Sequence, residues 1–389
     1  MVAWVLVLGG VAVVAYVLVG YPVVLRALAA RRGRPPCALA PEPLPTVSVL
    51  ISMYNEERTL ARKIASLWAL DYPPERVAVL VADDGSRDGT RALLERLAAE
   101  PEAGGRLRVL PDVGNLGKPA QLNRLAAEAT GDVLVLTDGR QPLAPRAVRA
   151  LVAALAEPDV GGASGSVVYQ TPEGQPVLIG VYWRYEEQLR AWEGLLDSVV
   201  GAAGPLNAVR RELFTPFPPN LVLDDVFTPL MVARAGRRFV FVPEAQAIET
   251  FAMVRRHEYD RRVRTQAGLY QLVRLAPWVL LPWRNRVWWQ LLSHRLGRLL
   301  IPWCLLAVLV GSLLGAPRHD FFVAVVVLQI LFYGYATLGW LGAGQAWAPP
   351  GSSLAYNLVL LAVTALAGLG RELRGRTTSR WAAAEQHRR

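Results

Sequence analysis

The hydrophobic positions of the chain follow two different patterns. Between residues 47 and 276, short apolar runs alternate with stretches whose apolar positions recur at helical spacing. Short apolar runs bounded by turn residues are typical of buried strands, and strands that alternate with helices form a parallel sheet covered on both faces. Both ends of the chain instead carry apolar stretches of the length that crosses a bilayer. The pattern therefore predicts an α/β domain flanked by transmembrane helices.

Two of the predicted strands end on carboxylates. The apolar run 133–136 leads to Asp138, and the run 77–82 leads to Asp83 and Asp84. In open α/β sheets, ligands bind just beyond the carboxyl ends of the strands. Acids at two such ends predict a site for a sugar, a nucleotide or a metal ion.

The distribution of charge around the first apolar stretch predicts its orientation. Residues 1–25 have no positive charge before them, whereas Arg26, Arg31 and Arg32 follow. A secretory signal peptide needs a basic leading segment and a shorter apolar core, so we favour a retained membrane anchor over cleavage. The positive-inside rule then places the N-terminus outside and the α/β domain in the cytoplasm, at the inner or plasma membrane of the cell.

The pattern divides the chain into six predicted segments. They are an N-terminal transmembrane helix (1–25), a basic and proline-rich linker (26–46), the α/β domain (47–276), an interfacial amphipathic segment (277–298), C-terminal transmembrane helices (299–370) and a basic tail (371–389). Three C-terminal crossings would place the tail outside, against the positive-inside rule. Either one apolar segment is re-entrant or interfacial, or the tail is an exception.

Composition narrows the class of partner. Hydrophobic residues make up 53% of the chain, and its formal net charge is +10. The arginines cluster beside the apolar segments, which indicates contact with anionic membrane lipids. No nucleic-acid-binding module accompanies them, so we expect no nucleic-acid partner. Cys37 and Cys304 are too few for a disulfide framework or a cysteine metal site.

Several short motifs follow one another in a specific order. They are Val49–Glu56, Asp83–Ser86, Asn115–Asn123, Asp138–Arg140, Leu223–Asp225 and Arg261–Thr265. Taken together they resemble the membrane-bound family 2 glycosyltransferases, the group that includes the cellulose, chitin and hyaluronan synthases. The resemblance implies a GT-A fold, which is Rossmann-like with a mostly parallel sheet. It also implies a nucleotide-diphosphate sugar donor and inversion at the anomeric carbon.

The resemblance assigns the first three motifs to the donor. The residues are Tyr54, Asn55 and Glu56 near the base and ribose, Asp83 and Asp84 as hydrogen-bond acceptors for base and ribose, and Lys118 at the diphosphate. A lysine in a glycine loop at a helix start also suits a diphosphate by its chemistry, because the ammonium and the helix dipole both favour negative charge. Structural alternatives are an ordinary strand turn, a helix cap and a solvated surface lysine.

The fourth motif departs from the family pattern. The resemblance places an Asp-x-Asp motif at Asp138-Gly139-Arg140, and its second acid would bind Mg²⁺ or Mn²⁺. An arginine at that position removes an oxygen ligand and repels the ion. One hypothesis is that Arg140 itself supplies the positive charge against the diphosphate. The other is that Arg140 points away and that Asp138 holds the metal together with phosphate and water.

The resemblance assigns the remaining residues to the transfer step. Asp225 would be the general base for the acceptor hydroxyl, with Asp224, Gly204, Arg261 and Arg264 near the diphosphate or the acceptor. Adjacent acids at a helix start also act as simple caps, which is the structural alternative for the aspartate pair. Thr265 replaces the tryptophan that the family places after the arginine. This weakens the case for long processive synthesis and leaves room for a small or lipid-linked acceptor.

These features predict an inverting membrane glycosyltransferase. The donor would be a nucleotide-diphosphate sugar, with UDP-linked sugars favoured, and the acceptor a polysaccharide or a lipid-linked molecule. Thr265 favours one alternative, a non-processive polyprenyl-phosphate-linked sugar transferase. Arg140 suggests another, a catalytically inactive partner subunit that binds nucleotide sugar. A Rossmann oxidoreductase is set aside because no Gly-x-Gly-x-x-Gly follows the first strand.

Overall fold

The computed structural model describes residues 1–171, 174–175, 181–250, 255–342, 347 and 349–380. The chain forms two compact units. The first, here called the helical unit, comprises residues 1–26, 255–271 and 289–377. The second, the sheet unit, comprises residues 27–254, 272–288 and the chain from 378 onward.

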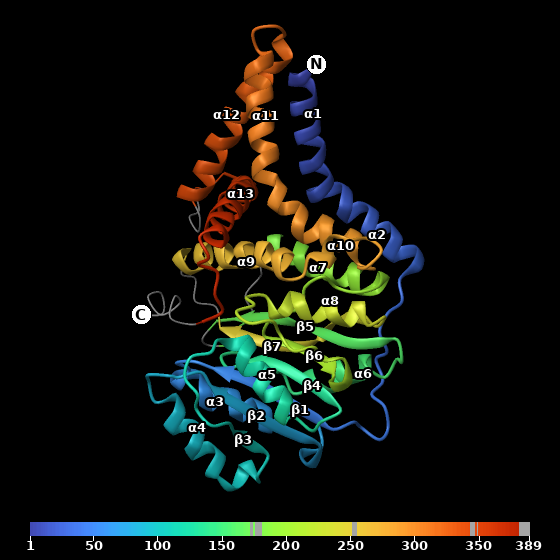
Figure 1. Ribbon diagram of the computed structural model, residues 1–389, viewed down its shortest axis with the longest axis vertical. Helices are drawn as coiled ribbons and strands as arrows, with labels where there is room; N and C mark the ends of the chain where they lie inside the picture. The colour runs from blue at the N-terminus through green and yellow to red at the C-terminus, as the bar shows by residue number, and fades with distance from the viewer. Residues whose placement is uncertain (172–173, 176–180, 251–254, 343–346, 348, 381–389) are drawn as a thin grey trace. The chain divides into compact units, whose positions relative to one another are not determined.

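The sheet unit is built on one seven-stranded sheet (Figure 1). Its strands are β1 (Val47–Met53), β2 (Val77–Asp83), β3 (Leu107–Val109), β4 (Val133–Asp138), β5 (Val160–Gln170), β6 (Leu206–Arg210) and β7 (Arg238–Thr250). Their order across the sheet is β3-β2-β1-β4-β6-β5-β7. All pairs are parallel except those that β6 makes with β4 and β5. The predicted mostly parallel α/β sheet is confirmed.

The pairing register places the functional strand ends side by side. Met53 of β1 lies opposite Asp83 of β2, and Ser52 of β1 lies opposite Asp138 of β4. Because side chains alternate between the faces of a strand, Thr137 and Asp138 leave β4 on opposite faces. Both faces of this strand end therefore take part in the site described below.

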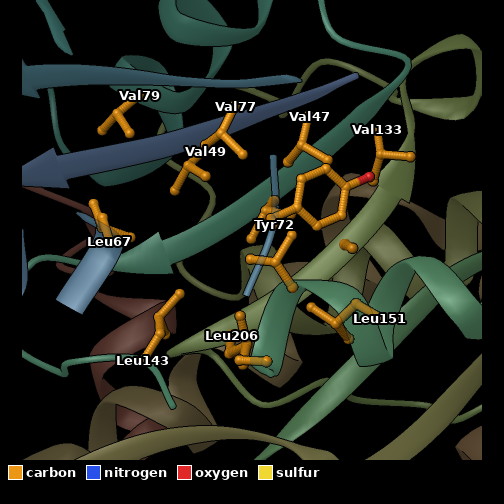
Figure 2. Packing of buried hydrophobic residues seen from close by; sticks show 14 of the residues in the cluster. Val47, Val49, Leu67, Tyr72, Val77, Val79, Val133, Leu143, Leu151 and Leu206 are labelled. Carbon is orange, nitrogen blue, oxygen red and sulfur yellow. The ribbon is translucent and has the colours of Figure 1, made fainter. Parts of the chain in front are cut away.

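Helices cover both faces of the sheet. They are α3 (Glu57–Trp68), α4 (Thr90–Ala99), α5 (Lys118–Glu128), α6 (Ala147–Ala154), α7 (Val181–Leu196) and α8 (Asp224–Arg234). One apolar core joins the odd-numbered residues of β1 and β2 to α3, α4 and α6, and Figure 2 shows Val47, Val49, Val77 and Val79 within it. Helix α5 packs against β1 and β2 without contributing to that core, which places it on the other face.

Two strands are less evident from the sequence pattern. Strand β6 follows a stretch of small residues and is antiparallel to β4 and β5. Strand β7 continues well past the apolar run 239–242, across an irregularity in its pairing with β5 that contains Pro243. Proline is tolerated at such bulges because it has no ladder hydrogen bond to lose there.

The helical unit consists of long apolar helices. Its elements are α1 (Val2–Ala15), part of α2 (Tyr21–Arg32), part of α9 (Arg255–Leu275), α10 (Trp288–Gln290), α11 (Ile301–Gly315), α12 (Asp320–Leu341) and α13 (Ser352–Leu373). Among the described residues, four helical stretches have the length and hydropathy to cross a membrane: Val2–Arg32, Trp288–Gly315, Asp320–Leu341 and Ser352–Leu373. Large side chains such as Leu328, Ile330 and Leu331 are more than 60% exposed on α12. Such a surface is typical of a lipid-facing helix.

Two of the predicted segments have composite secondary structure. The helical run of segment 1–25 continues through a π-helical turn at Tyr16–Gly20 to Arg32. Segment 277–298 begins with a short 3₁₀ turn at Pro277–Leu280, and helix follows from Trp288. That helix continues through a π-helical segment, Leu291–Leu296, into α11.

Candidate active site at the end of strand β4

The candidate site lies at the carboxyl ends of three adjacent strands. Strand β1 occupies the centre, with β2 on one side and β4 on the other. From β1 the chain builds β2 and β3 outward on one side and then returns to add β4 on the other side. The strand order therefore reverses between β1 and β4, and α/β sheets bind ligands at such a switch point. Asp83 ends β2 and Asp138 ends β4, as the sequence pattern predicts.

An ammonium joins two carboxylates at this point. Lys118 is the first residue of α5, and its Nζ lies 2.7 Å from Asp138 Oδ1 and 3.0 Å from Asp224 Oδ2. The side chains of Lys118 and Asp224 are 12% and 9% exposed, whereas that of Asp138 is 34% exposed. Burial lowers the pKa of Lys118, but the two carboxylates outweigh it and hold the pKa above its usual range. Lys118 is therefore a permanently charged group at a helix N-terminus.

The loop before Lys118 is shaped by Asp84. This fully buried carboxylate accepts hydrogen bonds from the amides of Leu116 (2.7 Å) and Gly117 (2.9 Å) and from Gln121 Nε2 (2.8 Å). Gly117 has φ +88°, a conformation that side-chain-bearing residues rarely adopt. The contacts of Asp84 indicate that it positions the glycine loop, and its predicted contact with the donor remains a prediction.

Asp83 has a different environment from its neighbour. It accepts a hydrogen bond from the Ser86 hydroxyl, and burial raises its pKa despite that bond. Its second oxygen, Oδ2, is buried and has no hydrogen-bond partner in the part of the chain that the structure describes. The Ser52 hydroxyl on β1 is also buried without a described partner. Unpaired buried polar atoms are uncommon in folded proteins, and these two lie at the carboxyl ends of neighbouring strands.

The residues after β1 connect two loops. Asn55, at φ +53°, donates its amide to Ser86 Oγ (2.9 Å) and accepts a hydrogen bond from the Arg87 amide through Oδ1 (2.8 Å). Glu56 accepts a hydrogen bond from Thr59 through its carboxylate (2.7 Å) at the start of α3. Tyr54 is 3% exposed. Asn55 thus ties the end of β1 to the turn that follows Asp83, and the contact of these three residues with the donor remains a prediction.

Arg140 is paired with a glutamate that the sequence analysis did not single out. Its Nη2 lies 2.7 Å from Glu249 Oε2, and Gln141 Nε2 donates to the same oxygen at 2.6 Å. Glu249 belongs to β7, far from Arg140 in the sequence. No group of three or more His, Cys, Asp or Glu side chains that could hold a metal ion occurs among the described residues. At the altered Asp-x-Asp position a divalent ion would find Asp138 and would need donor phosphates to complete its ligands.

The aspartate pair begins helix α8. Asp224 faces Lys118, as given above, while the Asp225 carbonyl accepts a hydrogen bond from the Ala202 amide (2.8 Å). A β-carbon on Gly204 would lie 3.8 Å from Asp225 Oδ2, in ordinary van der Waals contact. The two predicted residues Gly204 and Asp225 are therefore neighbours, and the glycine leaves open space beside the carboxylate.

A buried lysine lies on the other face of β4. Lys63 of α3 is fully buried, and its Nζ donates to Thr137 Oγ1 (2.8 Å) and to the Gln141 carbonyl (2.7 Å). Burial lowers its pKa to about 7, although the Asp138 carboxylate acts in the opposite direction. The sequence analysis missed this residue, although it lies between Leu60 and Ile64 on an otherwise apolar helix face.

Two predicted residues lie in the other unit. Arg261 and Arg264 belong to the part of α9 that forms the helical unit, whereas all the other candidate residues belong to the sheet unit. Thr265 donates its hydroxyl to the Arg261 carbonyl at 3.0 Å. The structure therefore gathers every candidate except these arginines in one unit.

Known proteins resemble this chain in sequence and in fold. A family model described as glycosyl transferase family 2 matches residues 48–215. An N-acetylglucosaminyltransferase of Bradyrhizobium elkanii is 33% identical over 128 residues, covering 32% of this chain and 68% of the relative. Another, from Mesorhizobium japonicum, is 28% identical over 232 residues, covering 55% and 53%. The chain spans about half the length of the curated relatives it matches first.

A solved structure shares the overall architecture. The mannosyltransferase PcManGT from Pyrobaculum calidifontis, in complex with GDP-Man and Mn²⁺, superposes with a TM-score of 0.73 at 23% identity. The match covers 95% of this chain and 99% of that one. The predicted GT-A type of α/β fold is therefore confirmed.

Proposed function

Because the chain belongs to glycosyl transferase family 2, we propose that it is a membrane-bound, inverting glycosyltransferase. The donor would be a nucleotide-diphosphate sugar, with UDP-linked sugars favoured. Since several relatives are named N-acetylglucosaminyltransferases, UDP-N-acetylglucosamine is the first donor to test. The acceptor would be a polysaccharide, as for the cellulose, chitin and hyaluronan synthases, or a lipid-linked molecule.

The observation that carries this proposal is the Lys118 ammonium between Asp138 and Asp224. It lies at the N-terminus of α5, at the switch point of the sheet. A helix N-terminus with a fixed positive charge binds a diphosphate, and the two carboxylates keep the lysine charged until the donor arrives. The unpaired Oδ2 of Asp83 would then be available to the nucleoside.

Asp225 would act as the general base of the reaction. The acceptor hydroxyl oxygen forms a bond to the anomeric carbon while the bond from that carbon to the diphosphate oxygen breaks. The hydroxyl proton passes to the Asp225 carboxylate, and the nucleoside diphosphate leaves with its electron pair. Gly204 leaves room beside the base for the acceptor. Arg261 and Arg264 are proposed to steady the leaving diphosphate, as the family pattern suggests.

A divalent cation fits this site only in association with the donor. Asp138 is the one carboxylate of the altered Asp-x-Asp position, and Arg140 is bound to Glu249. We therefore favour an ion held by Asp138 and the phosphate oxygens over a diphosphate neutralised by Arg140. Mg²⁺ or Mn²⁺ bound there would neutralise charge that develops on the leaving diphosphate.

The apolar helices support a membrane location. In the part of the chain that the structure describes, four helical stretches are long and apolar enough to cross a bilayer, and arginines flank them. We propose a multi-pass protein of the cell membrane with the sheet unit in the cytoplasm. One observation favours a second function, which is single transfer to or from a polyprenyl-phosphate carrier: Thr265 stands in place of the tryptophan expected for processive synthesis.

Nucleotide release by purified membranes tests the proposal. Wild type and Asp225→Asn are given a panel of UDP- and GDP-sugars, with Asp320→Asn as control, because Asp320 is also an acid in the first turn of a helix but is exposed on α12. We expect turnover with one donor, a loss of about 10³-fold or more in Asp225→Asn and wild-type activity in the control. Product length separates the processive from the single-transfer enzyme. UDP binding without turnover of any donor would instead identify an inactive partner subunit.

A further inference from the structure

The chain uses lysine in only two places. Of its 42 lysine and arginine residues, two are lysine and 40 are arginine. Both lysines reach the end of the same strand, Lys118 at Asp138 and Lys63 at Thr137. Because Thr137 and Asp138 leave β4 on opposite faces, the two ammonium groups hold this strand end from both sides. In this arginine-rich chain, lysine thus occurs only at these two positions.

Lys63 occupies an unfavourable place for a charge. It is fully buried on the face of α3 that carries Leu60 and Ile64, and both of its hydrogen-bond acceptors are uncharged oxygens. Taking an ammonium out of water is costly unless its surroundings compensate, and an apolar side chain of similar volume is often as stable or more stable. Stability alone therefore does not account for a lysine here.

The contacts of Lys63 join the donor side of the site to the acceptor side. Thr137 Oγ1, which accepts from Lys63, donates to the Pro205 carbonyl at 2.6 Å. Pro205 follows Gly204, the residue beside the Asp225 carboxylate. In the other direction, Lys63 holds the carbonyl of Gln141, whose side chain bonds Glu249 together with Arg140. One ammonium thus fixes the Asp138–Gln141 turn and the Gly204–Pro205 segment relative to each other.

We propose that Lys63 is a positioning residue of the transfer reaction, and this inference rests on the proposed function. Lys63 sets the distance between Asp138, which is proposed to hold the donor, and the base Asp225, without contacting either substrate. Misplacement of reacting groups by about 1 Å costs up to ~10²-fold in rate, so the effect should fall on the transfer step and spare donor binding. Arginine cannot replace it, because a planar guanidinium is larger and needs several in-plane partners.

The test compares Lys63→Met, Lys63→Arg, Thr137→Val and the double variant Lys63→Met/Thr137→Val in the full-length protein. The control is Arg62→Met, which removes the neighbouring positive charge from the exposed side of α3. Membranes supply the acceptor, and UDP-N-acetylglucosamine and the rest of the donor panel supply the substrate. The measurements are kcat and KM for nucleotide release, the dissociation constant of UDP, and the thermal midpoint in detergent.

We expect kcat to fall about 10- to 100-fold in Lys63→Met, while the donor KM and UDP affinity stay near wild type and the thermal midpoint is no lower than that of wild type. Lys63→Arg should not restore kcat, and Arg62→Met should match wild type. Since Lys63 acts through Thr137, the double variant should lose no more than the larger of the two single losses.

Several results would overturn the inference. Wild-type kcat in Lys63→Met, additive losses in the double variant, or a kcat loss accompanied by loss of UDP binding and of folded protein would each do so. In these cases turnover by the wild type would leave the proposed function intact. Absence of turnover in the wild type with every donor would instead remove the proposed function, and this inference with it.

Discussion

Lys118 and Lys63 both contact the end of β4, but the groups around their side chains differ. Lys118, on the side of α5, contacts two carboxylates, and its pKa is raised above the usual range. Lys63, on the side of α3, contacts a hydroxyl and a carbonyl, and burial lowers its pKa to about 7. The partners of each ammonium, rather than its burial alone, decide whether it remains charged.

The difference separates two kinds of contribution to one site. The α5 face presents charge, because a lysine held by carboxylates at a helix N-terminus can bind an anion. The α3 face fixes the positions of neighbouring groups, because the Lys63 ammonium is buried among protein acceptors and does not reach the substrate. Removal of the Lys118 charge should therefore affect donor binding and turnover, whereas removal of Lys63 should affect turnover alone.

The largest effect is expected from the charged face. Lys118→Met removes the group proposed to bind the diphosphate and leaves Asp138 and Asp224 as two unpaired acids close together. We expect kcat/KM for nucleotide release to fall about 10²- to 10³-fold, with the loss divided between donor KM and kcat. Removing one acid in Lys118→Met/Asp224→Asn relieves the repulsion, so the double variant should be no worse than Lys118→Met alone. A kcat/KM of Lys118→Met within threefold of wild type would contradict the proposal that Lys118 binds the diphosphate.

A somewhat smaller effect is expected from removing divalent ions. An ion shared by Asp138 and the phosphates should be weakly held, so a chelator should lower nucleotide release by about 10²-fold, and added Mn²⁺ or Mg²⁺ should restore it. Arg140→Gln should stay within about threefold of wild type, because its guanidinium is bound to Glu249. Full activity with chelator, together with a large loss in Arg140→Gln, would establish that Arg140 supplies the cation instead.

The central strands and their acids could be predicted from the sequence. The β1, β2 and β4 segments are uninterrupted apolar runs followed by turn residues, so both their type and their ends are clear. Strand β6 was not predicted because Leu206–Arg210 contains Asn207 and Arg210 and follows a glycine-rich stretch. Its place between β4 and β5 depends on antiparallel pairings between segments far apart in the chain, which local pattern does not specify.

Site residues could be predicted where a charged side chain directly follows a strand or begins a helix. Asp83, Lys118, Asp138 and the aspartate pair follow strand ends or begin helices, and the structure gathers them in one unit. Glu249 could not be predicted, because β7 reaches the turn of Arg140 through a long-range antiparallel bridge between Ala247 and Leu143, which local pattern does not specify. Lys63 was missed because one lysine on an apolar helix face looks like a flaw in the pattern. The scarcity of lysine in the composition was the available signal.

The smallest expected effect is a dependence of stability on pH that arises from Lys63. The pKa of Lys63 is about 7 in the folded protein and 10.5 when unperturbed. Between these values the unfolded chain binds a proton that the folded protein does not, so the free energy of unfolding should rise with pH, by at most ~1.4 kcal/mol per pH unit. Below pH 7 both states bind the proton, and the full cost of the buried charge remains.

Thermal midpoints of wild type and Lys63→Met in detergent at pH 6.5, 7.5 and 8.5 would measure this dependence. The variant lacks the titrating group, so its midpoint minus that of wild type should be largest at pH 6.5 and shrink toward pH 8.5. Lys118 cannot produce the same trend, because its raised pKa keeps it charged across this range. A difference between the two proteins that is independent of pH would mean that Lys63 stays charged throughout. Lys63 would then be permanently charged, as Lys118 is. The two lysines would differ only in the groups that they contact.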